Sequence, residues 1–205
     1  MKVAGIFPIP IGMSNINRPF TDIETNFFAK ILGNLKPNQG NETSVDTYIL
    51  EHPEMADIKA FVLNGIKEYL NETNPLPDDL DIYITQSWIN VTKNGGWHHG
   101  HVHSNSIVSG TIYINANETH DCVWFNNYNN YIKLYNITFE PKRHTMFNQP
   151  HAEIKVNTGD LLLFPSPIHH QVPESANTDL RISLSFNTFF KGHLGASNYL
   201  TELIL

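Results

Sequence analysis

The sequence predicts a mainly β fold, an antiparallel sandwich or barrel with N-terminal helices packed against one outer face. Two observations support this fold class. Apolar residues recur at helical spacing in the first third of the chain, and from residue 81 onward they alternate with a period of two. At 205 residues the chain is long enough for one well-buried domain. We therefore predict a single domain over 1–205, with helical support at about 18–75 and a β core at about 81–190.

Two helices are expected before residue 75. Thr21 and Glu24 form a capping-box pattern that opens a helix over 21–35, and residues 36–40 end it with a proline and a glycine. A second helix is predicted over 53–70, and the prolines at 75 and 77 break the pattern after it. The apolar N-terminal segment before these helices is interpreted as the first strand.

The remainder of the chain contains short segments of alternating polarity separated by turn residues. Glycine-, asparagine- and proline-rich pieces stand between them, as expected for an antiparallel β protein. The predicted strands are 81–92, 107–115, 122–125, 131–139, 152–156, 160–165 and 181–190.

Composition restricts the class of function. A net charge of −7 argues against duplex nucleic acid and anionic membranes as partners, because both require clustered Lys and Arg. Cys122 is the only cysteine, so an intramolecular disulfide and a cysteine-rich zinc site are both excluded. No apolar run reaches the length of a membrane helix, and we expect a cytoplasmic protein.

Histidines gather in one short segment. Four of the 11 histidines occupy positions 98, 99, 101 and 103. Residues i and i+2 of a strand share a face, so His99, His101 and His103 could project together. Imidazole is the commonest ligand of iron, zinc, copper and nickel, and this segment alone does not distinguish among zinc, copper and iron. The alternative is a polar surface turn after the two glycines at 95 and 96.

A second group of polar residues follows near the C-terminus. An apolar strand is followed by His169 and His170, and Arg181 stands eleven residues after His170. Alternation places Arg181, Ser183 and Ser185 on one face of the last strand. An arginine there suits a bidentate clamp for a carboxylate, whereas a salt bridge at the rim is the alternative.

This arrangement resembles the 2-oxoglutarate/Fe(II) oxygenase superfamily. The spacing of His170, Arg181 and Ser183 matches one of its motif variants residue for residue, and the resemblance covers about 82–190. More narrowly, the chain is similar to a phage- and bacteria-associated branch related to prolyl 4-hydroxylases. The segments that carry the likeness are 87–90, 101–106, 109–113, 159–166 and 181–187.

The resemblance implies a double-stranded β-helix, or jelly roll, with an Fe(II) centre and 2-oxoglutarate as cosubstrate. It implies iron ligation by His101, His103 and His170. Arg181 would bind the 5-carboxylate of 2-oxoglutarate, with help from Ser183 and Tyr113. The activity implied is a hydroxylase-type oxidation of an unidentified substrate, either a small molecule or a peptidyl residue, coupled to formation of succinate.

One position departs from the family pattern. The second ligand is ordinarily a carboxylate, and here it is His103, which leaves the iron site one unit more positive. Three alternatives follow from this departure. The ligand pair could be His99 and His101, Asp121 could supply a carboxylate, or the chain could bind a metal without oxygenase activity.

Two other functions compete with this one. A cupin-like dioxygenase would use three histidines without 2-oxoglutarate, but it would leave Arg181 and Ser183 without a role. A non-catalytic β-sandwich that binds a ligand would make the histidines incidental. An exposed edge strand at the apolar N-terminus, or the C-terminal segment 199–205, could support a homodimer.

Overall fold

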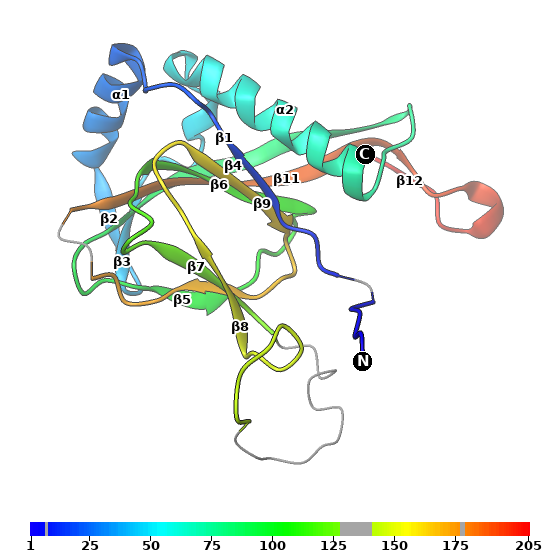
Figure 1. The fold of residues 1–205 in the computed structure, drawn as a ribbon. Coiled ribbons are helices and arrows are strands. Elements are labelled where there is room, and N and C mark those ends of the chain that lie inside the picture. The colour runs from blue at the N-terminus through cyan, green and yellow to red at the C-terminus, as the bar shows by residue number, and fades with distance from the viewer. Residues whose placement is uncertain (7, 128–140, 177–178) are drawn as a thin grey trace.

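Two antiparallel β-sheets face each other in the protein, and two helices cover the outer side of the larger sheet (Figure 1). This architecture is seen in a computed structural model that describes residues 1–6, 8–127, 141–176 and 179–205. The predicted jelly roll with helices on one outer face is confirmed.

The larger sheet carries the helices and the smaller sheet lies below it (Figure 1). The helices are α1 (Asp22–Leu32) and α2 (Ala56–Thr73). Short 3-10 helices occupy Ile49–Glu51, Pro53–Met55 and Ser197–Tyr199. The larger sheet has the order β1 (Gly12–Asn15), β9 (Asp160–Pro165), β6 (Val108–Asn115), β11 (Arg181–Leu194), β4 (Leu80–Thr92), β3 (Asn41–Ser44) and β2 (Leu35–Asn38), with β12 (Leu203–Ile204) paired to β11. The smaller sheet has the order β5 (His98–His101), β10 (His170–Val172), β7 (Cys122–Asn126) and β8 (His151–Lys155).

The capping box predicted for the first helix is present. The Thr21 hydroxyl accepts the Glu24 N–H at 3.2 Å, and the Glu24 carboxylate accepts the Thr21 N–H at 2.7 Å. An ion pair from Arg18 to the buried Glu24 carboxylate, at 2.6 Å, adds to this start signal. The second helix begins at Ala56, after a 3-10 turn at Pro53–Met55, and continues to Thr73, three residues beyond the predicted end.

Alternating side chains of the larger sheet supply two separate cores. Along β9, Leu161 and Leu163 pack beneath the helices, whereas Leu162 and Phe164 face the smaller sheet. The same alternation divides β11, because Ile182, Leu184 and Phe186 belong to the helix-side core. The opposite face of β11 is therefore turned toward the space between the sheets.

Most of the predicted strands are present, with shifted ends, and several short ones were missed. Residues 36–40, expected to be only a helix stop, lie largely within a hairpin formed by β2 and β3. Strands β5, β10 and β12 were not predicted either. Each is four residues or shorter, too short to show a period of two. The predicted strand 131–139 lies outside the described residues.

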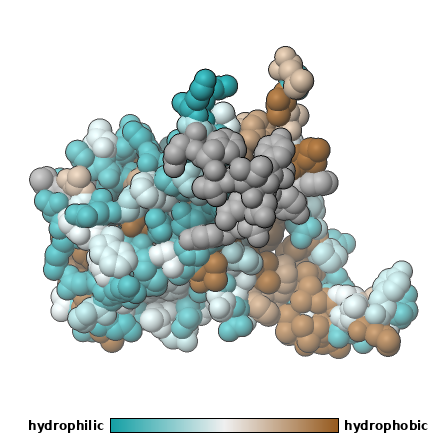
Figure 2. Space-filling view, turned by 90° about the horizontal axis from the view of Figure 1, so that it is seen from below, coloured by the Kyte–Doolittle hydropathy of each residue, from teal (hydrophilic) through white to brown (hydrophobic). Residues whose placement is uncertain are grey.

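The C-terminal segment stands apart from the body of the protein (Figure 1). Figure 2 shows hydrophilic residues over most of the face seen from below, with hydrophobic residues gathered toward this projection. Leu200 and Ile204 are 95% and 77% exposed. A homodimer formed through this segment stays a prediction. In the described part of the chain, no helix has the length and apolarity needed to span a membrane.

Candidate metal centre

Pairing of two short strands brings together histidines that are far apart in the sequence. In the β5–β10 ladder, His170 is the direct partner of His101. Gly100 lets the two strands approach, since a Cβ at this position would overlap the ring of His169. His103 follows β5 by two residues, and its backbone N–H donates to the Ser166 carbonyl at 3.0 Å. The three histidines predicted as ligands therefore share one site.

Each of these rings is oriented by a hydrogen bond from Nδ1 to an oxygen. His101 Nδ1 lies 2.8 Å from the His99 carbonyl, and His170 Nδ1 lies 3.0 Å from the Ile168 carbonyl. His103 Nδ1 lies 2.6 Å from Asn187 Oδ1. A neutral imidazole has one donor and one acceptor nitrogen. Because Nδ1 is the donor in all three rings, every Nε2 presents a bare lone pair.

The three Nε2 atoms suit a metal ion. Their ring nitrogens lie within 4.8 Å of one another, and Nε2 of His101 is 3.2 Å from Nε2 of His103. Two acceptor nitrogens cannot hydrogen-bond to each other, so this approach is repulsive unless a cation lies between them. Neighbouring ligands of an octahedral metal, with metal–nitrogen bonds of about 2.1 Å, are about 3.0 Å apart. The donor set therefore fits a divalent transition metal.

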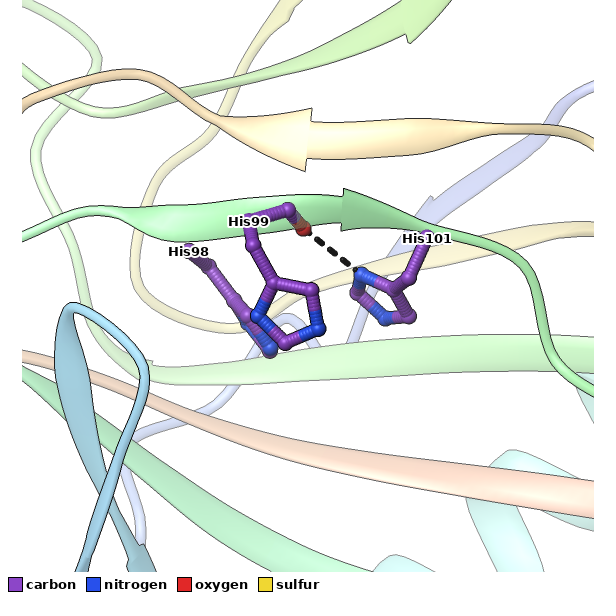
Figure 3. Close-up of side chains that lie close together, drawn as sticks. All are labelled: His98, His99 and His101. Atoms are coloured by element: carbon purple, nitrogen blue, oxygen red, sulfur yellow. Dashed lines mark hydrogen bonds between the residues drawn. The ribbon is translucent and has the colours of Figure 1, made fainter.

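A second group of histidines overlaps the first. Figure 3 shows His98, His99 and His101 with their side chains on the same side of β5 and the dashed bond from His101 to the His99 carbonyl. Their ring nitrogens also lie within 4.8 Å of one another. The two groups share His101, and one ring nitrogen binds one metal, so they are alternatives. We call His101, His103 and His170 the triad. Unlike these three rings, the His99 ring has no fixed tautomer, because its buried Nδ1 has no hydrogen-bond partner among the described residues.

A pocket extends from the histidines into the space between the two sheets. Its lining combines the three triad histidines and His98 with the polar face of β11 and with apolar residues of both sheets. The lining residues are Trp88, Asn90, His98, His101, His103, Thr111, Tyr113, Val123, Leu162, Phe164, His170, Gln171, Val172, Arg181, Ser183 and Ser185.

Arg181 lies in this pocket with a buried counterion. Its side chain is 3% exposed, and its Nε is 3.9 Å from Asp121 Oδ1. Its Nη2 donates to the Tyr113 hydroxyl at a long 3.4 Å. The guanidinium Nε has no hydrogen-bond partner among the described residues, and neither does the buried hydroxyl of Thr92, which is paired with Arg181 across β4 and β11. Such a site can accept an anion that supplies the missing hydrogen bonds.

Ser183 and Tyr113 are direct neighbours across β11 and β6, and both are almost fully buried. Burial raises the pKa of Tyr113 to about 12, so its hydroxyl keeps its proton and can donate a hydrogen bond. The structure thus brings Arg181, Ser183 and Tyr113 to one pocket with the histidines. Asp121 contacts Arg181 and forms no metal group with the histidines in the described part of the chain.

Asn187 was not among the predicted site residues, and Asp121 was considered only as an alternative metal ligand. Asn187 contacts His103, Asp121 pairs with Arg181, and His98 and Trp88 line the pocket. A signal for Asn187 was present, since it continues the alternation of Arg181, Ser183 and Ser185 on one face of β11. No comparable local pattern identifies Asp121.

Comparison with known families agrees with this geometry. The family described as "Putative 2OG-Fe(II) oxygenase" matches residues 86–187, about half of the chain. The matched segment includes the three histidines, Arg181 and Asn187. The chain belongs to the 2-oxoglutarate/Fe(II) oxygenases. No curated protein sequence matches this oxygenase.

Solved structures of similar fold include a prolyl 4-hydroxylase and a protein solved with 2-oxoglutarate. A prolyl 4-hydroxylase from Pseudomonas putida is 15% identical, with a TM-score of 0.55 over 87% of this chain and 92% of its own. HygX from Streptomyces hygroscopicus, solved with nickel, 2-oxoglutarate and hygromycin B, is 12% identical, with a TM-score of 0.51 over 86% and 82%. At these identities the likeness shows the jelly roll alone.

Replacing His99 with alanine is expected to leave iron binding by the oxygenase within about twofold of wild type, because its side chain lies outside the triad. The measurement is a titration of the metal-free protein with Fe(II) under anaerobic conditions. His103→Ala is the matched comparison and should weaken binding. The opposite ranking would make His99 and His101 the ligand pair.

The buried histidines predict how the stability of the metal-free oxygenase changes with pH. Burial lowers the pKa of His170 to about 2, from an ordinary value of 6.5. Below pH 6.5 the unfolded chain takes up a proton at this position and the folded chain does not, so stability falls as the pH falls. The contribution is about 1.4 kcal/mol per pH unit below pH 6.5.

This pH dependence can be checked by urea unfolding of metal-free protein between pH 7.5 and 5.5. The variant His170→Leu should show a smaller loss of unfolding free energy over that range than wild type. Identical slopes in the two proteins would contradict the assignment of a neutral, buried His170.

Proposed function

We propose that the protein uses His101, His103 and His170 to bind Fe(II) and Arg181 to bind the 5-carboxylate of 2-oxoglutarate, and that it oxidises a small-molecule or peptidyl substrate. The observation that supports this assignment is the convergence of three bare Nε2 atoms in a pocket that also contains a buried arginine. When bound, the iron and 2-oxoglutarate supply the oxidising chemistry, in which O2 converts the cosubstrate to succinate and CO2.

The residues of the chain contribute orientation. The three histidines would hold the metal, and a metal with three protein ligands can also take exogenous ligands. Because the three imidazoles are neutral, they leave the double positive charge of the ion uncompensated, which favours an anionic ligand such as a 2-oxo acid. Arg181 offers a second positive charge in the same pocket, and the Tyr113 hydroxyl and Ser183 lie beside it.

Apolar side chains around the metal site limit access of water. The Phe164 ring centroid lies 4.6 Å from that of His170 and 5.2 Å from that of Phe125. These contacts pack the His170 ring against apolar side chains, and Phe164 also lines the pocket. Exclusion of water protects a reactive centre from side reactions.

The test is an anaerobic titration of the Fe(II)-loaded protein with 2-oxoglutarate, recorded by visible absorption. A weak metal-to-ligand charge-transfer band supports bidentate binding of the cosubstrate, and succinate should form when O2 is admitted. Iron binding without this band would favour a three-histidine dioxygenase that does not use 2-oxoglutarate. Absence of iron binding would overturn both enzymatic functions.

A further inference from the structure

A polar network lies behind His103, on the side away from the other triad histidines. Asn187 Oδ1 accepts the His103 Nδ1–H at 2.6 Å and the Ser109 hydroxyl at 2.9 Å. Ser109 is fully buried and pairs directly with Asn187 across β6 and β11. An amide oxygen has two lone pairs, and both are used here.

The donors and acceptors of this network have a fixed order, because two of its hydrogen bonds involve backbone groups. The Thr188 N–H donates to Ser106 Oγ at 3.2 Å, and the Ser106 hydroxyl in turn donates to the Val108 carbonyl at 3.3 Å. The Ser166 hydroxyl donates to Ser106 Oγ at 2.7 Å. With both of these hydroxyl hydrogens used, Ser109 accepts none from Ser166 or Ser106, which lie 2.8 and 3.2 Å away, and its own hydroxyl donates to Asn187 Oδ1 at 2.9 Å. The chain of donors therefore ends on an acceptor, the amide oxygen.

The direction of the network determines whether His103 can bind a metal. With the amide oxygen toward His103, Nδ1 carries the hydrogen and Nε2 is bare. If the amide were turned round, its NH2 group would donate to Nδ1, the ring hydrogen would move to Nε2, and that nitrogen could no longer be a ligand. A ring tautomer set by the partner of the other nitrogen is a general feature of metal-binding histidines.

We propose that Asn187, oriented by Ser109, is a positioning residue that keeps His103 in the metal-binding tautomer. This inference rests on the proposed iron site and concerns how that site is made. It explains how a neutral imidazole serves where the family ordinarily has a carboxylate. The partner amide is also neutral, so the protein adds no negative charge either to the ligand or behind it.

The local sheet geometry supports a specific role for this position. Thr85 is an extra residue of β4, because Asn187 pairs with Gln86 and Thr188 pairs with Ile84. The Thr85 hydroxyl donates to the Asn187 carbonyl at 3.2 Å. Bulges of this kind occur beside functional sites and re-aim a side chain. Here the bulge lies at the residue that holds His103.

The first test reads the tautomer directly, by long-range proton–nitrogen NMR correlations of histidine rings in metal-free protein. Wild type should show His103 protonated at Nδ1, and Asn187→Leu should shift the population toward protonation at Nε2. Asn90→Leu is the matched control, since Asn90 is a buried asparagine whose amide donates to Ser185 Oγ at 3.1 Å. Protonation of His103 at Nε2 in wild type would overturn the proposal.

The second test measures the affinity of the variants for Co(II), without cosubstrate. Asn187→Leu should bind the metal about 10- to 100-fold more weakly than wild type. Asn187→Asp keeps the acceptor oxygens and should bind at least as tightly as wild type, whereas a role in packing alone would weaken both variants equally.

The two hypotheses fail in different ways. If wild type bound no Co(II) or Fe(II), the proposed iron site would be wrong, and the tautomer measurement would still test Asn187. If wild type bound the metal and Asn187→Leu matched it in both affinity and tautomer, the role of Asn187 would be wrong and the iron site would stand.

Discussion

Replacing His170 with alanine is expected to abolish the charge-transfer band and the formation of succinate. A bound structural metal is worth about 10–16 kcal/mol in sites of four ligands. Loss of one ligand then removes about 3 kcal/mol of the metal-binding free energy, which lowers the metal affinity on the order of a hundredfold. His170 is the only triad histidine on β10. The other two lie in and just after β5, so neither of them can replace the lost ligand.

The control for this variant is the adjacent histidine. His169 lies on the other side of the β5–β10 pair, where its Nδ1 is 2.9 Å from the Asn126 amide nitrogen. His169→Ala should therefore keep both the band and succinate formation. Loss of the band in His169→Ala, with its retention in His170→Ala, would show that the wrong histidine of the pair has been assigned.

Removing the charge of Arg181 is expected to raise the concentration of 2-oxoglutarate needed for half-saturation on the order of 100-fold or more. Truncating one member of a buried charge pair costs about 2–5 kcal/mol in binding. The expected increase is specific to the 5-carboxylate. Pyruvate has the 2-oxo acid group and lacks that carboxylate, so it should bind wild type and variant with similarly low affinity.

A variant that removes the charge of Arg181 should also remove the charge of Asp121, because these two side chains form a buried ion pair. Leaving one charge of a buried pair uncompensated destabilises a protein by about 3–5 kcal/mol. The double variant Arg181→Gln with Asp121→Asn removes both charges, keeps the shape of the side chain at position 121 and leaves a shorter polar side chain at position 181. If this folded double variant bound 2-oxoglutarate as tightly as wild type, Arg181 would not be the carboxylate anchor.

Elements with strong local signals could be predicted from the sequence. The capping box at Thr21 placed the start of α1 within one residue, and alternation located β4, β6, β9 and β11. Strands β5 and β10 carry no such signal, because they are short and contain mainly polar residues. They form because the histidine-bearing segments pair with each other, which is a long-range effect.

The candidate site was predictable to a similar degree. Residue type and spacing identified the histidines and Arg181, and the structure brings these residues into one pocket. Their hydrogen-bond partners were not identified, since His103 and Asn187 are separated by 84 positions. Asp121 was considered as a metal ligand, but its contact with Arg181 depends on packing between β6, β7 and β11 that no local pattern reports.

The long strand β11 carries both ends of the site on one face. Arg181 stands at its start, and Asn187, which holds His103, stands six residues later, about 20 Å along an extended strand. Hydrogen bonding to β4 is in register throughout this interval. If Arg181 and the three histidines hold the two ends of 2-oxoglutarate as proposed, this strand sets the distance between them. Insertion of one residue between Arg181 and Asn187 would turn one of these two side chains toward the helices. The fixed spacing would also favour a dicarboxylic acid of one length over its shorter and longer homologues.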